Sequence, residues 1–152
     1  MNSSLRRRTV WLAAASLIIV VCEGCDFGHA TPTAPDQSNV QFSTTDLTVG
    51  TGAVAANGNS VGTTYAVWLY SSSATAKDHK GTQLQGGTPP PFVVGAGTLI
   101  KGYEMAIVGM AVGGTRRAIV PPSLAFGATG DSTGAIPPNA ALVFEIQLNS
   151  IQ

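Results

Sequence analysis

Apolar and polar residues alternate most regularly at the C-terminal end of the chain. Every second residue from Leu142 to Leu148 is apolar, so the segment 142–151 predicts a strand with one buried face. The segment 64–70 (TYAVWLY) is rich in β-branched and aromatic residues and predicts a second strand. The segment 115–121 (TRRAIVP) predicts a third strand, which its closing proline ends. A shorter strand is expected to start at residue 46.

The segment 100–110 has the spacing of an amphipathic helix. Its apolar residues recur at steps of three and four, and a glycine pair at 113–114 follows as an end signal. The segments 71–81 and 88–91 predict loops, and 81–87 predicts a turn. The helix must bury its apolar stripe on the inner face of the sheet. The expected fold class is therefore α+β, a twisted antiparallel half-barrel sheet of about five strands wrapped around one short α-helix.

The N-terminal end has the pattern of an export signal. Arg6, Arg7 and Arg8 precede an uninterrupted apolar run of 12 residues at 10–21 (VWLAAASLIIVV). A membrane-spanning helix needs about 20 such residues, whereas the apolar part of a signal peptide needs about 7–15. Residues 1–24 are therefore predicted to be a signal peptide, with the periplasm or cell envelope as the destination.

The two cysteines, Cys22 and Cys25, lie where this apolar run ends. Their spacing is also that of a Cys-x-x-Cys redox pair, but the strand-to-helix pattern around such pairs is missing here. A bacterial lipoprotein signal fits better, with cleavage after Gly24 and a lipid on Cys25 that anchors the chain in a membrane. Cleavage before Cys22 is one alternative, and cleavage after Ala30, which would give a soluble secreted form, is another.

Composition and charge define the remaining organisation. Residues 25–44 mix proline, threonine, serine and aspartate without periodicity, and predict a flexible tether to a single domain at 45–152. The whole chain has 8 basic and 8 acidic side chains, and charged residues make up only 11% of it. Such a balance provides no positive field for nucleic acid. The domain is expected to be a monomer.

The residues on which most enzymes rely are scattered. His29 and His79 stand alone, so no metal site is expected. The acidic residues form no pair, and no serine lies in a nucleophile elbow. The segment 95–97 (GAG) lacks the third glycine of a dinucleotide-binding loop. The sequence therefore predicts neither a metal nor a cofactor.

Three groups of motifs carry a family resemblance. They are 92–104 (FVVGAGTLIKGYE), 109–117 (GMAVGGTRR) and 125–145, which contains AFGATG, AIPPNA and LVFE. Their order and spacing resemble those of the FKBP family of peptidyl-prolyl cis/trans isomerases, over about residues 46–152. The resemblance implies a sheet wrapped on a short helix and isomerisation of Xaa–Pro bonds without a cofactor.

The resemblance also implies a role for each matching position. Tyr65, Gln85, Ile100 and Phe126 match catalytic positions, and the backbone N–H of Ile100 would hold a substrate carbonyl. Further matching positions would line the binding pocket: Leu84, Phe92, Leu99, Tyr103, Ala135, Ile136 and Phe144. For Phe92 and Phe144, a role in the core alone is the alternative.

The chain departs from the family pattern at several of these positions. Gln85 occupies the position where the family usually has Asp, and Leu84 occupies a position where it has Phe. Phe126 replaces the Tyr whose hydroxyl bonds the ligand, and Tyr103 replaces the Trp that forms the pocket floor. Another aromatic pocket position falls on Pro90. The implied function is isomerisation of Xaa–Pro bonds in folding envelope proteins. The alternative is a catalytically weak module that binds or chaperones proline-containing segments. Implied partners are proline-containing polypeptides and macrolides of the rapamycin type.

Overall fold

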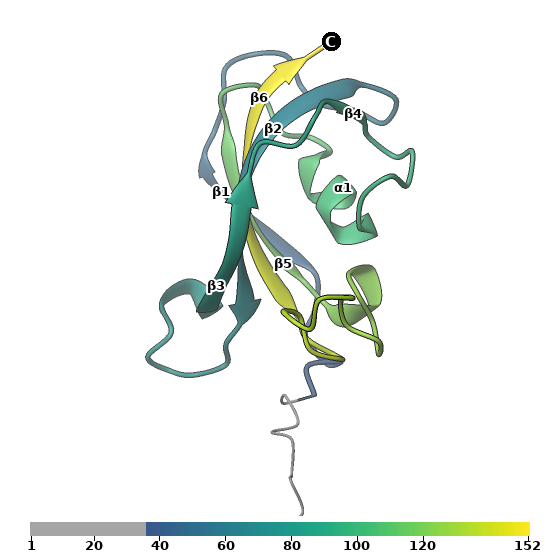
Figure 1. The fold of residues 1–152 in the computed structure, drawn as a ribbon. Coiled ribbons are helices and arrows are strands. Elements are labelled where there is room, and N and C mark those ends of the chain that lie inside the picture. Colours follow the sequence, from purple (N-terminus) through teal and green to yellow (C-terminus); the bar gives the residue numbers. More distant parts are fainter. Residues whose placement is uncertain (1–35) are drawn as a thin grey trace, which may run out of the picture. The chain divides into compact units, whose positions relative to one another are not determined.

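The computed structural model describes residues 36–152. The predicted signal peptide, Cys25 and the first part of the predicted tether lie outside the described residues. The described chain forms one antiparallel sheet with one helix beside it (Figure 1). In chain order, the elements are β1 (Ser43–Thr48), β2 (Ser60–Tyr70), β3 (Lys80–Gly87), β4 (Phe92–Val93), α1 (Lys101–Ile107), β5 (Thr115–Val120) and β6 (Leu142–Ile151).

The sheet confirms the expected α+β class. Its strands lie in the order β1-β5-β6-β2-β3, and β4 pairs with the start of β2. β6 is central between β5 and β2, which is consistent with the regular alternation that its sequence shows. Two 3-10 turns, Lys77–His79 and Pro122–Leu124, lie in the connections.

Several bounds differ from the sequence expectation. β3 forms where 81–87 was expected to be a turn, and the sheet has six strands instead of about five. β3 is an edge strand with exposed, glycine-rich residues, so it lacks the alternation by which buried strands are recognised. α1 is shorter than 100–110, because Ile100 and Val108 both have extended backbone angles.

Ordered contacts reach further towards the N-terminus than the expected domain start at residue 45. β1 begins at Ser43 and pairs with β5. The side chain of Gln37 donates to the Tyr70 carbonyl at 3.0 Å and accepts from the Ala141 N–H at 2.7 Å. The expected boundary after residue 44 therefore lies inside β1.

The core fills the space between α1 and the facing side of the sheet. α1 contributes Tyr103, Ala106 and Ile107, which are all at most 4% exposed. β6 contributes its alternate residues, and the core also takes in residues of β2 and β5: Val61, Val67, Ala118, Val120, Leu142, Phe144, Ile146 and Leu148. The helix thus lies close against β5 and β6. This close packing leaves no room for a side chain at position 102, which is a glycine.

Replacing Gly102 with alanine is expected to destabilise the fold, although alanine favours helices. A Cβ at this position would lie 2.2 Å from Cγ1 of Val120, which is fully buried. Overpacking of this kind costs about 1–3 kcal/mol, more than the roughly 0.5–1 kcal/mol of helix propensity gained. Urea unfolding of Gly102→Ala measures the loss. Gly87→Ala, where a Cβ meets nothing within 4 Å, is the matched control and is expected to stay near the native value.

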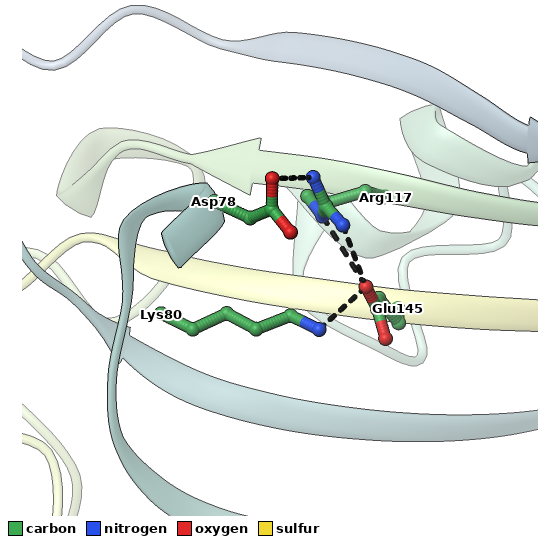
Figure 2. Close-up of polar contacts among 4 residues, drawn as sticks. All are labelled: Asp78, Lys80, Arg117 and Glu145. Atoms are coloured by element: carbon green, nitrogen blue, oxygen red, sulfur yellow. Dashed lines mark hydrogen bonds and ion pairs between the residues drawn. The ribbon is translucent and has the colours of Figure 1, made fainter. Parts of the chain in front are cut away.

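A network of four charged side chains connects β3, β5 and β6 with the loop before β3 (Figure 2). Arg117 of β5 pairs with Glu145 of β6 at 3.0 Å and with Asp78 at 2.9 Å, and Lys80 of β3 reaches Glu145 at 2.6 Å. Lys80 also lies 4.2 Å above the ring of Trp68. The network therefore connects the edge strand β3 and the loop before it to the centre of the sheet.

The free energy of unfolding is expected to fall as the pH drops below about 4.5. Burial works to raise the pKa of Glu145, but hydrogen bonds from Lys80 and Arg117 outweigh it and hold the pKa below its ordinary 4.5. A hydrogen bond from Arg116 likewise lowers the pKa of Asp46 from 3.8. Groups with lowered pKa stabilise the fold fully above their ordinary values, and this stability is lost as the pH falls through the folded values.

Thermal unfolding between pH 7 and pH 2 measures this dependence. The variant Glu145→Gln is expected to be less stable at pH 7 and to lose less stability on acidification. An equal slope in both proteins would show that the network does not couple to folding.

Candidate functional site

A pocket of about 710 Å³ opens between the sheet, the start of α1 and the loop that precedes β6. This volume lies within the usual range for small-ligand sites, roughly 300–1,000 Å³. Its lining comes from β2, β3, β6, α1 and the loops between them: Tyr65, Val67, Gln83, Leu84, Gln85, Pro89, Leu99, Ile100, Tyr103, Phe126, Gly130, Asp131, Ser132, Thr133, Ala135, Ile136, Leu142 and Phe144.

Three aromatic rings from three elements meet in this pocket. The ring of Tyr103 lies edge-on to Tyr65 at a centroid distance of 5.7 Å and edge-on to Phe144 at 5.4 Å. Tyr65 and Phe144 lie 6.2 Å apart. These distances fall in the range at which aromatic pairs attract each other. The rings therefore hold one another and form a rigid apolar wall.

Tyr103 is buried, and its hydroxyl is satisfied within the fold. It shares a hydrogen bond of 2.9 Å with the hydroxyl of Thr63, which is fully buried. Burial raises the pKa of Tyr103 to about 12. The phenol is therefore neutral at physiological pH and adds no charge to the pocket.

A buried carboxylate shapes the loop that leads into α1. Glu104, 6% exposed, accepts hydrogen bonds from the backbone N–H groups of Gly95 at 3.0 Å, Gly97 at 3.2 Å and Leu99 at 3.1 Å. Gly95 and Gly97 have φ of +85° and +72°, which glycine adopts without strain. The loop 95–99 thus wraps around one side chain of the helix and places Leu99 and Ile100 at the pocket.

Ile100 joins this loop to α1. Its carbonyl accepts from the N–H groups of Tyr103 at 3.0 Å and Glu104 at 3.3 Å. Among residues 36–152, the N–H of Ile100 has no hydrogen-bond acceptor. A free backbone donor therefore lies beside an apolar pocket.

Asp131 orders the loop on the opposite side of the pocket. Its carboxylate accepts from the Ile136 N–H at 2.7 Å and from the hydroxyl of Thr133. The hydrogen bond from Thr133, followed by that from Ile136, lowers the pKa of Asp131 from its ordinary 3.8. The carboxylate is thus held by its own loop, and Ile136 is fixed at the pocket.

Comparison with known proteins assigns the family. The model of the FKBP-type peptidyl-prolyl cis-trans isomerase family matches residues 52–149. The chain belongs to this family. The matched range contains α1, β2 to β5, most of β6 and every residue that lines the pocket.

Individual FKBP proteins show the same likeness. The chain is 41% identical over 111 residues to the chloroplastic peptidyl-prolyl cis-trans isomerase FKBP16-4 of Arabidopsis thaliana, covering 70% of this chain and 46% of that one. It is 38% identical over 107 residues to FK506-binding protein 4 of Neurospora crassa, covering 70% and 21%. The crystal structure of AtFKBP13 superposes with a TM-score of 0.60 at 27% identity, covering 77% of this chain and 98% of the other.

The chain spans less than half the length of these two curated relatives, 46% and 21%. The likeness thus concerns the FKBP domain and not the relatives as whole proteins. Within residues 36–152, the single α-helix is too short to cross a membrane.

The structure brings almost all of the predicted site residues together. Tyr65, Gln85, Ile100 and Phe126 line the one pocket described above, and so do six of the further predicted residues: Leu84, Leu99, Tyr103, Ala135, Ile136 and Phe144. Phe92 does not line it. Its ring lies 6.0 Å from the ring of Tyr103, so it packs on the floor residue instead of facing the cavity. Cys25 lies outside the described residues.

Several lining residues were not predicted. Val67 and Leu142 lie on the same strand faces as Tyr65 and Phe144, so the alternation alone could have found them. Pro89 lines the pocket where Pro90 was expected. Gln83 lies on β3 next to two predicted residues. The ladder between β2 and β3 has a bulge there, which lets three consecutive residues border the pocket.

Proposed function

We propose that the protein is a peptidyl-prolyl cis/trans isomerase that acts on Xaa–Pro bonds through this pocket. The observation that carries the proposal is the interlocked set of Tyr65, Tyr103 and Phe144 beside the free N–H of Ile100. Two of the ionisable side chains that line the pocket bring no free charge into it, because Tyr103 is neutral and the Asp131 carboxylate is held by its own loop. The aromatic part of the pocket is therefore apolar, with a backbone donor beside it.

Such a pocket suits rotation about an amide bond. Resonance sets a barrier of about 18–20 kcal/mol, and the uncatalysed exchange takes tens to hundreds of seconds. The planar amide is more dipolar than the twisted transition state, in which resonance is lost. An apolar, water-poor site therefore stabilises the transition state relative to the ground state. No covalent bond to the protein forms or breaks, so the reaction needs no nucleophile.

Each group of residues in the pocket would have its own role in catalysis. The aromatic rings would enclose the proline ring, and the N–H of Ile100 would hold the carbonyl of the residue before or after the bond. Phe126 and Gln85 line the pocket without the hydroxyl and carboxylate expected from the family resemblance. One lost hydrogen bond of about 0.5–1.5 kcal/mol lowers binding by up to roughly tenfold.

The proposed setting is the cell envelope. Residues 1–24 would direct export, and a lipid on Cys25 would hold the domain at a membrane as a monomer, where it would act on folding envelope proteins. The basis for this part is the basic and apolar pattern of residues 6–21 together with the position of the cysteine. Incorporation of radiolabelled palmitate into the native chain, but not into Cys25→Ser, is the expected result. Equal labelling of the native chain and of Cys25→Ser would show that Cys25 does not carry the lipid.

Catalysis is tested by following cis-to-trans relaxation of a four-residue Leu–Pro peptide with the purified protein. Faster relaxation that is abolished by rapamycin is expected, because a macrolide would occupy the pocket that takes the proline. If the folded protein leaves the relaxation rate unchanged, the proposed isomerase activity is wrong. Suppression of client aggregation without any rate enhancement would then favour the binding and chaperone function instead.

A further inference from the structure

Two apolar side chains, Met105 in α1 and Val108 directly after it, face solvent on the same side as Lys101. Tyr103, Ala106 and Ile107 point into the core, whereas Lys101, Met105 and Val108 are exposed at steps of four and three residues. A surface helix usually carries polar residues on that stripe. Here Met105 is 42% exposed and Val108 is 40% exposed.

This stripe borders a second hollow of about 680 Å³, which we call the α1 hollow. Its other walls come from Asn57 and the loop 95–99. Leu99, 36% exposed, lines both the α1 hollow and the pocket of about 710 Å³ described above. The two concave sites are therefore neighbours across a single apolar side chain.

Two charged side chains line the α1 hollow, and only one of them is free to pair with a ligand. Glu104 also lines it, but its carboxylate is taken up by the three N–H groups of the loop 95–99. Lys101 is exposed and forms no ion pair within the described residues. The hollow therefore offers apolar surface next to one available positive charge.

We propose that the α1 hollow is a second substrate subsite that takes an apolar residue and an adjacent acidic residue of an extended polypeptide whose proline occupies the first pocket. This inference rests on the proposed function and adds a sequence preference to it. Continuity through Leu99 supports it, since an extended chain leaving the pocket over this residue passes directly onto the hollow. Met105 and Val108 would contact the apolar side chain, and Lys101 would attract the carboxylate.

The test compares peptides that share one Leu–Pro centre. One is the four-residue peptide. The others have sixteen residues, with Leu-Leu-Glu on the N-terminal side, Leu-Leu-Glu on the C-terminal side, or only serines flanking the centre. The readout is the ratio of kcat/KM for each long peptide to that for the short one, and fluorescence anisotropy measures the affinity of the same peptides.

One of the two Leu-Leu-Glu peptides is expected to exceed the serine peptide by about tenfold in this ratio and in affinity, as burial of one large apolar side chain allows. Met105→Glu and Lys101→Glu are expected to remove most of this advantage. Leu47→Glu is the matched control, because Leu47 is also 42% exposed but lines neither site. It is expected to retain the advantage.

Equal ratios and affinities for all three long peptides would overturn the subsite, as would an advantage that survives Met105→Glu. Failure of the proposed function looks different, because the four-residue peptide would then not be isomerised by the native protein. The affinities still decide whether the α1 hollow binds Leu-Leu-Glu in that case.

Discussion

Replacing Tyr103 with alanine is expected to lower the free energy of unfolding by about 3–5 kcal/mol, the usual cost of removing a large buried aromatic side chain. The ring packs against Tyr65, Phe92 and Phe144, so its removal opens a cavity between α1 and the sheet. The change also leaves the buried hydroxyl of Thr63 without its partner. Guanidinium unfolding followed by circular dichroism measures the loss, and isomerase activity is expected to disappear with the pocket floor.

The variant Tyr103→Phe distinguishes the contribution of the ring from that of the hydroxyl. The ring contacts remain, and only the 2.9 Å hydrogen bond with Thr63 is lost, so a smaller cost of about 1–3 kcal/mol is expected. Most of the catalytic rate should survive, because the floor offers its apolar ring to the substrate. Equal destabilisation by phenylalanine and alanine would contradict this division of roles.

Replacing Glu104 with alanine is expected to have the second largest effect, a loss of about 3 kcal/mol in the free energy of unfolding. Three backbone N–H groups would lose the buried carboxylate to which they donate. The loop 95–99 would then loosen, and with it Leu99 and Ile100 at the pocket. Glu104 is a positioning residue, so kcat/KM should fall although its carboxylate does not touch the substrate.

Glu104→Gln is the matched variant. An amide oxygen can still accept from Gly95 and Gly97, but its NH₂ group would then face the N–H of Leu99. An intermediate loss of stability and rate is expected, with faster hydrogen exchange at the Leu99 amide than at Gly95. Alanine and glutamine variants with native activity would show that the loop does not depend on this carboxylate.

The parts of the fold that were predictable from the sequence are those with a strong local pattern. β6 alternates over its buried half, and the apolar spacing around Tyr103 marks α1. β3 could not be predicted in this way, because it is an exposed edge strand whose pairing depends on the neighbouring β2. Ile100 ends up outside the helix because its backbone is extended, which apolar spacing does not encode.

The site divides along similar lines. The family resemblance implied Tyr65, Tyr103 and Phe144 as site residues, and three separate elements bring them together. The anchoring of the loop 95–99 by Glu104 was missed, since a single buried carboxylate that binds backbone N–H groups has no spacing pattern. The neighbouring α1 hollow depends on which helix face is exposed, and this requires the packing of α1 on the sheet.

The central claim, that the pocket and the N–H of Ile100 accelerate Xaa–Pro rotation, is tested most directly by two substitutions at this position. Ile100 has φ of −60°, which proline adopts, so Ile100→Pro removes the donor and can keep this φ angle. Ile100→Ala shortens the side chain and keeps the donor. In the relaxation assay, the proline variant is expected to be slower than the alanine variant by up to about tenfold, the value of one hydrogen bond. Equal rates in two folded variants would contradict the account.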